Sequence, residues 1–302
     1  MSTWEVILQQ GVNGLISGSF YALVALGYSM VYGIIKLLNF AHGDIYMTGA
    51  FVCLSVFGAL SAFLPGWAGL LCAIAAAMFF AAALGFLAQR FAYRPLLGAP
   101  RLSLLITAIG VSLVIYNAVM AVTNSQPLFF NSGLNSSAGM QIGGITVTYI
   151  QMALLLVSAL VMTGLTLFIG RTKTGKAMRA IALDQDTCRL MGVNVNKTIG
   201  LTFMIGSALA AIAGGMACVY YGNVQYNMGY TIGIKAFTAA VIGGIGSIPG
   251  AMLGGLLLGL LEAAGTQILG SSWKDVFAFG LLIVILILRP NGLLGKSEIE
   301  RM

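Results

Sequence analysis

Residues 67–88 read WAGLLCAIAAAMFFAAALGFLA and contain no charged side chain. A helix rises 1.5 Å per residue, so a run of this length crosses a hydrocarbon core of about 30 Å. The charge-free run extends from Ile45 to Gln89, and two others cover Leu102–Gly170 and Thr198–Ile234. Only 8% of the 302 residues are charged, against about 25% in soluble domains. The pattern predicts an all-α polytopic membrane protein.

The apolar runs predict about eight transmembrane helices in two related halves. We place them near residues 12–34, 45–64, 67–88, 102–122, 148–170, 199–221, 250–270 and 274–289. We expect a single domain over 1–302, with an N-terminal half 1–170, a basic loop 171–197 and a C-terminal half 198–302. The uncharged segment Thr123–Val147, rich in Asn, Ser and Gly, is expected to be an external loop.

The basic residues indicate orientation. Twelve of the fifteen lie in Arg90–Arg101, Arg171–Lys197 and Arg289–Arg301. Short basic loops mark the cytoplasmic side of a membrane protein, so the net charge of +7 requires no nucleic-acid partner beside the lipid bilayer. Counting crossings places the N-terminus outside and the C-terminus inside. The short piece Ala236–Ile248 is then either a squeezed extra crossing, or it dips in and returns while the next helix starts deep.

Two segments, Tyr32–Asp44 and Ile242–Gly250, interrupt the apolar pattern at corresponding places in the two halves. Irregular backbone at membrane depth is tolerated only where it is buried in protein or lines a wet cavity, and paired Gly/Pro interruptions point to a translocation path. Two ordinary loops are the alternative. The candidate path residues are Asn39, Phe40, His42, Asp44, Gly244, Gly246, Ser247 and Pro249.

Ionisable groups beside such an interruption are functional candidates, because burying them is costly. Asp44 contacts substrate on one interpretation and only caps the following helix on the other. Glu262, inside an otherwise apolar stretch, is expected to bond to a neighbouring helix.

The sequence offers no catalytic or metal-binding constellation. Gly170–Lys176 has the spacing of a phosphate-binding loop, but Ala177 stands where a hydroxyl is required and a span precedes it instead of a strand. His42 is the only histidine, which excludes a two-histidine metal motif. We therefore expect no enzyme activity and no cofactor bound by this chain.

The basic loop contains residues at helical spacing, Ala177, Ala180, Ile181, Asp184 and Cys188, and Gly192 supplies a stop. A short helix is predicted here. It either docks into a groove of a partner or lies on the membrane surface.

Several stretches together resemble the H-type permeases of branched-chain amino-acid ABC importers, nearly end to end. They are GSFYALVALG at 18–27, VYGII at 31–35, NFAHGD at 39–44, AYRP at 92–95, the stretch 235–255 and RPNGLLG at 289–295.

The resemblance implies that Lys176–Gly192 is a coupling helix that docks on an ATPase, with Ala177, Arg179, Ala180, Asp184 and Gly192 in the contact. It implies a homologous second permease subunit, two ABC ATPase subunits that use ATP and Mg²⁺, and a periplasmic or surface-tethered binding protein for Leu, Ile or Val. The location would be the bacterial cytoplasmic (inner) membrane. The alternatives are a related importer of urea or short amides, and a passive small-solute channel.

Overall fold

The computed structural model describes residues 3–130, 139–142 and 144–295. These residues contain eight helices long and apolar enough to cross a membrane, which confirms the predicted class and number. The helices are α1 (Thr3–Ile35), α2 (His42–Leu60), α3 (Gly66–Leu87), α4 (Arg101–Val122), α5 (Tyr149–Arg171), α8 (Val195–Tyr221), α10 (Ile248–Leu269) and α11 (Lys274–Leu288), the last extended by a 3-10 turn at Ser271–Trp273. The main difference from the predicted bounds is α1, which begins nine residues early. A helix that satisfies its own backbone groups can continue beyond the bilayer through polar residues such as Gln9.

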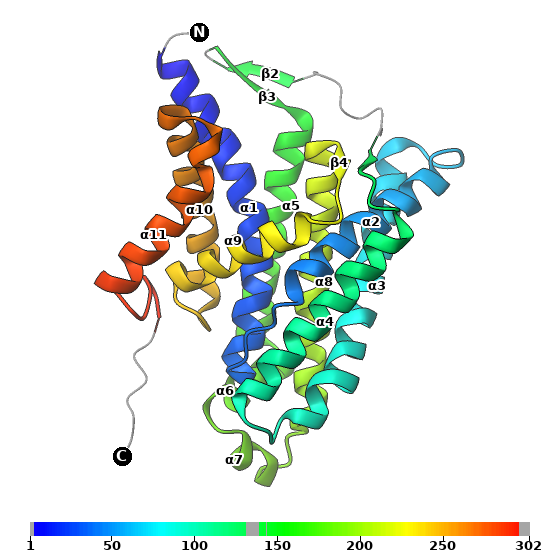
Figure 1. The fold of residues 1–302 in the computed structure, drawn as a ribbon, viewed down its shortest axis with the longest axis vertical. Helices are drawn as coiled ribbons and strands as arrows, with labels where there is room; N and C mark the ends of the chain where they lie inside the picture. Colours follow the sequence, from blue (N-terminus) through cyan, green and yellow to red (C-terminus); the bar gives the residue numbers. More distant parts are fainter. Residues whose placement is uncertain (1–2, 131–138, 143, 296–302) are drawn as a thin grey trace.

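Shorter elements complete the described chain (Figure 1). They are a π-helical turn at Ala88–Tyr93 and a 3-10 turn at Arg94–Leu96 after α3, α6 (Lys173–Leu183), α7 (Gln185–Leu190), α9 (Met228–Gly243), and the strands β1 (Leu128–Phe129), β2 (Gly139–Ile142), β3 (Ile145–Thr148) and β4 (Asn223–Val224). β1 pairs with β4 and β2 with β3, both antiparallel. The predicted loop Thr123–Val147 thus contains strands, although 131–138 and 143 lie outside the described residues, as does the basic tail from 296 onward.

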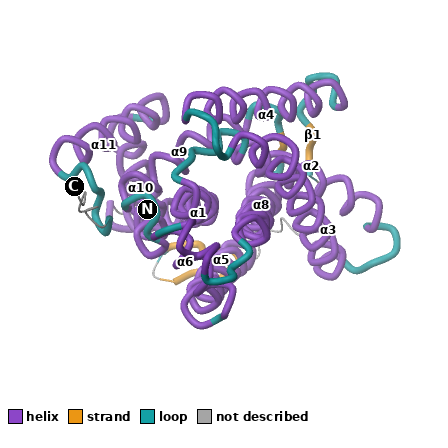
Figure 2. The backbone as a smooth tube through the Cα atoms, turned by 90° about the horizontal axis from the view of Figure 1, so that it is seen from below, coloured by secondary structure: helices purple, strands orange, loops and turns teal. Residues whose placement is uncertain are grey.

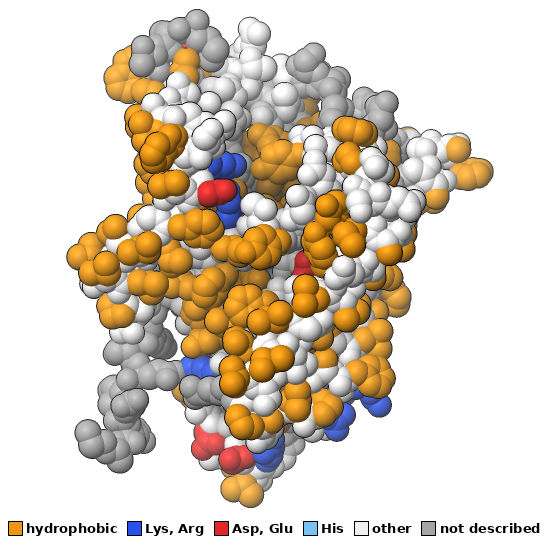
Figure 3. Space-filling view, in the orientation of Figure 1, with side chains coloured by type: hydrophobic (Ala, Val, Ile, Leu, Met, Phe, Trp, Pro, Cys, Tyr) orange, Lys and Arg blue, Asp and Glu red, His pale blue; other side chains and the backbone are white. Residues whose placement is uncertain are grey.

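The core is built around α1 and α8. In each, 83% of the most apolar window is buried, against 11% in α4 and 6% in α11. Figure 2 shows α1 and α8 in the middle of the bundle, with α4 and α11 at its outside. The apolar side chains of the outer helices cover much of the face drawn in Figure 3, as expected for helices in contact with lipid or another membrane subunit.

α1 and α10 approach each other closely through glycines. Gly14 and Gly18 of α1 face Gly255 and Gly259 of α10, and a Cβ atom on Gly259 would collide with the backbone of Gly18. Two Gly-x-x-x-Gly spacings therefore meet across this helix pair. Small residues let backbones pack closely in a membrane, where no hydrophobic effect drives helices together.

α9 covers the first part of the short piece Ala236–Ile248 that the count of crossings left open, but it begins eight residues earlier, at Met228, and ends at Gly243. Its 16 residues span about 24 Å, less than the hydrocarbon core of about 30 Å. In Figure 1 it slants across the middle of the bundle, and α10 then rises from its lower end. The arrangement agrees with a segment that dips in and returns, with the next helix starting deep.

Candidate translocation path and coupling segment

The first interruption lies between α1 and α2. α1 ends at Ile35, and Lys36 adopts a left-handed backbone with φ +57°, which an L-residue rarely takes. Asn39 is buried and accepts a hydrogen bond of 2.7 Å from the Tyr93 hydroxyl, while the Phe40 side chain is 40% exposed. The predicted irregular backbone is thus present and is held by the π-helical turn after α3.

His42 is enclosed by protein. It is 1% exposed, and its ring lies edge-on to Tyr28 with 4.9 Å between ring centroids. Gly27 and Gly206 leave the room for this ring, since a Cβ on Gly27 would collide with it. Its Nε2 atom has no hydrogen-bond partner within the described part of the chain. The position links α1, α2 and α8.

Asp44 lies in the first turn of α2 but does not cap it. Ala41 occupies the cap position, with no side-chain hydrogen bond to the helix. The Asp44 carboxylate accepts a hydrogen bond from Ser112 of α4, and it lies against Gly229 of α9. Asp44 therefore ties the start of α2 to an outer helix, a role that the capping interpretation had not included.

The second interruption joins α9 to α10. Gly244 and Gly246 have φ values of +103° and +88°, and Gly246 donates a backbone hydrogen bond of 3.0 Å to the Ser29 hydroxyl of α1. Ser247 caps α10 by accepting a hydrogen bond from the Gly250 N–H, and Pro249 follows in the first turn. Here the local sequence determines the local structure directly.

The structure places the candidate path residues in two groups. The start of α2 packs on α9 near Gly229 and Gly233, whereas the second interruption is the far end of α9. Both interruptions border one cavity of about 520 Å³, but through Tyr32, Lys36 and Ile245 and not through the predicted residues. Lys36 could have been predicted as a cavity residue from the sequence, because it is a charged residue within the first interruption.

The candidate coupling segment consists of two helices, α6 and α7, so the prediction of one short helix was wrong. Its backbone is extended at Asp184, with φ −155°, and α7 starts anew there. The Asp184 carboxylate accepts hydrogen bonds from the backbone of Asp186 and Thr187 and from the Thr187 hydroxyl. These bonds hold the pKa of Asp184 below its usual value, and the bond from the Thr187 hydroxyl has the largest effect. The Asp184 carboxyl group therefore stays ionised at neutral pH. Helical spacing alone could not show that Asp184 would cap a new helix and that the first helix would end there.

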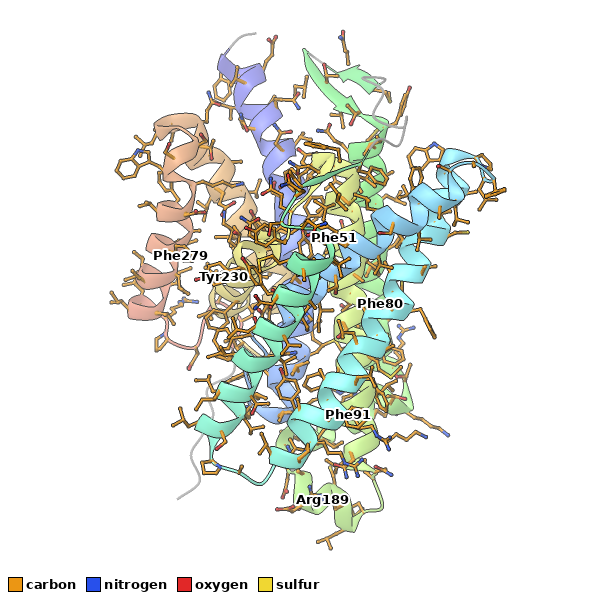
Figure 4. All side chains as sticks on the ribbon, turned by 45° about the vertical axis from the view of Figure 1, so that its right-hand side comes forward. Phe51, Phe80, Phe91, Arg189, Tyr230 and Phe279 are labelled. Atoms are coloured by element: carbon orange, nitrogen blue, oxygen red, sulfur yellow. The ribbon has the colours of Figure 1, made fainter. Side chains whose placement is uncertain are left out.

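The inner face of the coupling segment is packed and its outer face is apolar at the tip. Ala177 and Ala180 are half-buried, and Gly192 ends α7 with φ +81°. At the tip three large side chains are 79–90% exposed, which sequence reasoning missed although they stand out in a polar loop: Leu183, Leu190 and Met191. Arg189 marks this end of the molecule in Figure 4.

Two side chains of the coupling segment bond to the ends of membrane helices. The Gln185 side chain donates a hydrogen bond of 3.1 Å to the Ile34 carbonyl at the end of α1, and Arg179 donates one of 2.8 Å to the Ile169 carbonyl of α5. A cavity of about 90 Å³ is lined by Arg179 of α6, Ser29 of α1 and Gly246 of the second interruption. The coupling segment, the end of α1 and the second interruption thus border one small space.

A buried ion cluster lies at the opposite part of the bundle. Lys235 Nζ of α9 is 2.9 Å from Glu262 Oε1 of α10 and 2.8 Å from Asp275 Oδ1 of α11, and Lys274 Nζ is 3.4 Å from Glu262 Oε2. Tyr21 of α1 donates a hydrogen bond of 2.8 Å to Glu262. The expected bond from Glu262 to a neighbouring helix is confirmed. Among the described residues, no group of three His, Cys, Asp or Glu side chains could hold a metal ion.

Eight apolar spans around two interrupted segments, with a polar helical segment at one end, define a multi-pass α-helical membrane protein built for transport. The sequence matches the family described as branched-chain amino acid transport system / permease component over residues 11–286. The chain belongs to this family.

Relatives support the assignment over nearly the whole length. The high-affinity branched-chain amino acid transport system permease protein BraD of Pseudomonas aeruginosa is 48% identical, over 98% of each chain. The corresponding LivH protein of Escherichia coli K12 is 42% identical, over 98% of this chain and 97% of its own. A solved metal-chelate type ABC transporter in an inward-facing conformation has a TM-score of 0.48 at 15% identity, covering 96% of this chain and 89% of that one.

Proposed function

We propose that the chain is the membrane-spanning permease subunit of an ATP-driven importer of branched-chain amino acids, and that it couples to separate ATPase subunits. The full-length similarity to permeases named for branched-chain amino acids supports the substrate class. The coupling rests on one observation: the coupling segment bonds to Ile34 at the end of α1 and shares a cavity with Gly246 in the second interruption.

The proposed setting follows from this role. The coupling segment faces the cytoplasm and docks on one of two ATPases that use ATP and Mg²⁺, while a binding protein delivers Leu, Ile or Val from outside. A homologous permease subunit completes the path. The N-terminus lies outside the bacterial inner membrane and the C-terminus lies inside. The exposed apolar tip, Leu190 with Met191, supplies the kind of surface that a partner would cover.

The proposed mechanism is alternating access. When ATP closes the ATPases, the coupling segment moves with them and shifts the end of α1 through Gln185. The backbone at Gly244–Ser247 lies outside any helix, so it rearranges without breaking a helical hydrogen-bond ladder. Movement of the docking surface is thereby transmitted to the membrane interior.

Co-purification with uptake tests the proposal. The wild-type chain is expected to bring two ATPases and a second permease with it, and to support ATP-dependent uptake of labelled leucine. The double variant Leu190→Asp, Met191→Asp is expected to lose most ATPase capture and uptake, because the tip would become charged.

Phe63→Asp is the control, because Phe63 is 82% exposed in the loop between α2 and α3, which lies far from α6 and α7 in Figure 1. This variant is expected to retain both activities. Wild-type uptake of urea in place of leucine, or leucine flux without ATP, would favour the related amide importer or a passive channel instead.

A further inference from the structure

A cavity of about 350 Å³ lies beside the buried ion cluster. It is bordered by Tyr21, Tyr46 and Tyr221 from α1, α2 and α8, by Lys235 of α9 and by Lys274 at the start of α11. Small-molecule sites measure about 300–1,000 Å³, so this cavity suits a small solute. Figure 3 shows a hollow flanked by basic and acidic side chains on the upper part of the drawn face.

Two basic and two acidic side chains lie at or beside the cavity, and the two acidic ones differ in how deeply they are buried. Glu262 is 1% exposed and is held by Tyr21 and Lys235, whereas the Asp275 side chain is 62% exposed. An exposed partner contributes little to an ion pair and exchanges easily. A carboxylate from outside can therefore replace Asp275 at Lys235 without leaving a buried charge uncompensated. Lys274, with 35% of its side chain exposed, offers a second cation at the same place.

A polar atom in the cavity wall lacks a partner. The Tyr46 hydroxyl is buried and forms no hydrogen bond to any described residue, although burying an unpaired hydroxyl is costly. A ligand that bonds to this hydroxyl would remove the cost. The tyrosine rings, with Met228 and Ile232 nearby, supply apolar surface, and the side-chain oxygens of Asn223 and Asn227 can accept from an ammonium group.

We infer that this cavity is a weak binding site for a free zwitterionic amino acid with an apolar side chain. Its carboxylate lies at Lys235 and Lys274, its ammonium group bonds to the neutral oxygens, and its side chain lies against the tyrosine rings. The inference rests on the proposed function, because it places a binding site for the proposed substrate within this chain. α8 begins beside the coupling segment and ends at Tyr221 in the cavity wall, so the site lies at the far end of α8 from that segment.

Binding to the full-length chain, with its co-purifying partners in nanodiscs and without binding protein, tests the site. Saturation-transfer NMR is measured with leucine, with 4-methylpentanoate, which lacks the amine, and with 3-methylbutylamine, which lacks the carboxylate. Leucine is expected to bind and to be displaced by 4-methylpentanoate more readily than by the amine. Tyr46→Phe and Lys274→Gln are each expected to weaken leucine binding by about three- to tenfold, the effect of one lost hydrogen bond or charge contact.

Matched variants separate a binding role from a structural one. Tyr230→Phe changes an exposed tyrosine of α9, and Lys197→Gln an exposed lysine at the start of α8; both are expected to bind leucine as the wild type does. Tyr46→Phe should melt no lower than wild type, since it removes an unpaired hydroxyl.

Unchanged leucine binding in Tyr46→Phe and Lys274→Gln would overturn the proposed binding site. The proposed function would still stand in that case, provided that the wild-type importer takes up leucine. Failure of the wild type itself to take up leucine with ATP and binding protein would instead overturn the proposed function.

Discussion

Asp44 and Asp184 are both acidic residues at the start of a helix, yet they bond differently. Asp184 stands at the cap position with an extended backbone, which brings its carboxylate over the N–H groups of Asp186 and Thr187. Asp44 stands three residues beyond the cap position of α2, and its carboxylate accepts from Ser112 on another helix. One residue type therefore stabilises a local turn in one place and a tertiary contact in the other, because the backbone position decides what the carboxylate can reach.

Replacing Asp184 tests whether the cap transmits movement. Asp184→Leu removes the side-chain acceptor and loosens the start of α7, so uptake is expected to fall at least fivefold while ATP hydrolysis continues. Both are measured in the reconstituted importer. Asp184→Asn should behave as wild type, because Asn is an equally good helix cap. Full uptake by Asp184→Leu at normal expression would exclude a coupling role for the cap.

At the scale of elements, two kinds of contact hold α10 in place. Glycines on α1 and α10 allow close backbone packing, and Glu262 joins α10 to α9 through Lys235. The first contact tolerates no added volume, and the second tolerates no unpaired charge.

The packing contact predicts a position-dependent cost of adding a side chain. Gly259→Leu inserts volume against the Gly18 backbone and is expected to destabilise the chain by about 1–3 kcal/mol or to prevent its assembly. Gly280→Leu on α11 is the control, since a Cβ there meets nothing within 4 Å. Thermal unfolding in detergent compares the two variants, and equal stability would contradict close packing of α1 on α10.

The ion pair predicts non-additive costs. Glu262→Met leaves Lys235 with only its exposed partner Asp275, and removal of one member of a buried pair typically costs about 3–5 kcal/mol. The double variant Lys235→Met, Glu262→Met is expected to be more stable than either single variant, because no buried charge is then unpaired. A double-mutant cycle of melting temperatures measures this coupling, and simple additivity would show that the two side chains do not interact.

On the scale of the whole molecule, α1 and α8 form a buried centre, and the thinly buried α4 and α11 lie outside it. The coupling segment projects from one end, whereas the loop between α2 and α3, which contains Phe63, lies far from it (Figure 1). The distribution of basic residues predicts which end is cytoplasmic.

Labelling in intact cells checks this orientation. In a cysteine-free background, a cysteine replacing Phe63 is expected to react with a membrane-impermeant maleimide, since this position is 82% exposed and the proposed orientation places it outside. A cysteine replacing Leu190, at 88% exposure, is expected to react only after permeabilisation. The reverse pattern would invert the topology.

The sequence by itself determined the membrane class, the number of spans, the two interruptions and the family. These depend on local properties: the length of an apolar run, the absence of charge, and Gly or Pro in the backbone. The second interruption formed where Gly244, Gly246 and Pro249 predicted it. Whether the short piece Ala236–Ile248 crosses the membrane or dips in and returns remained open at that stage, because its apolar length fits either alternative.

Only the tertiary structure decided which distant residues meet. Lys235 and Glu262 stand on different helices, and nothing in their spacing marks them as partners. His42 could lie in a path or in protein until the glycines of α1 and α8 were seen to enclose it. Helical spacing predicted one helix in the basic loop, yet the hydrogen bonds of Asp184 divided it in two. In each case the deciding free energy comes from packing or pairing between segments, which periodicity along one segment does not contain.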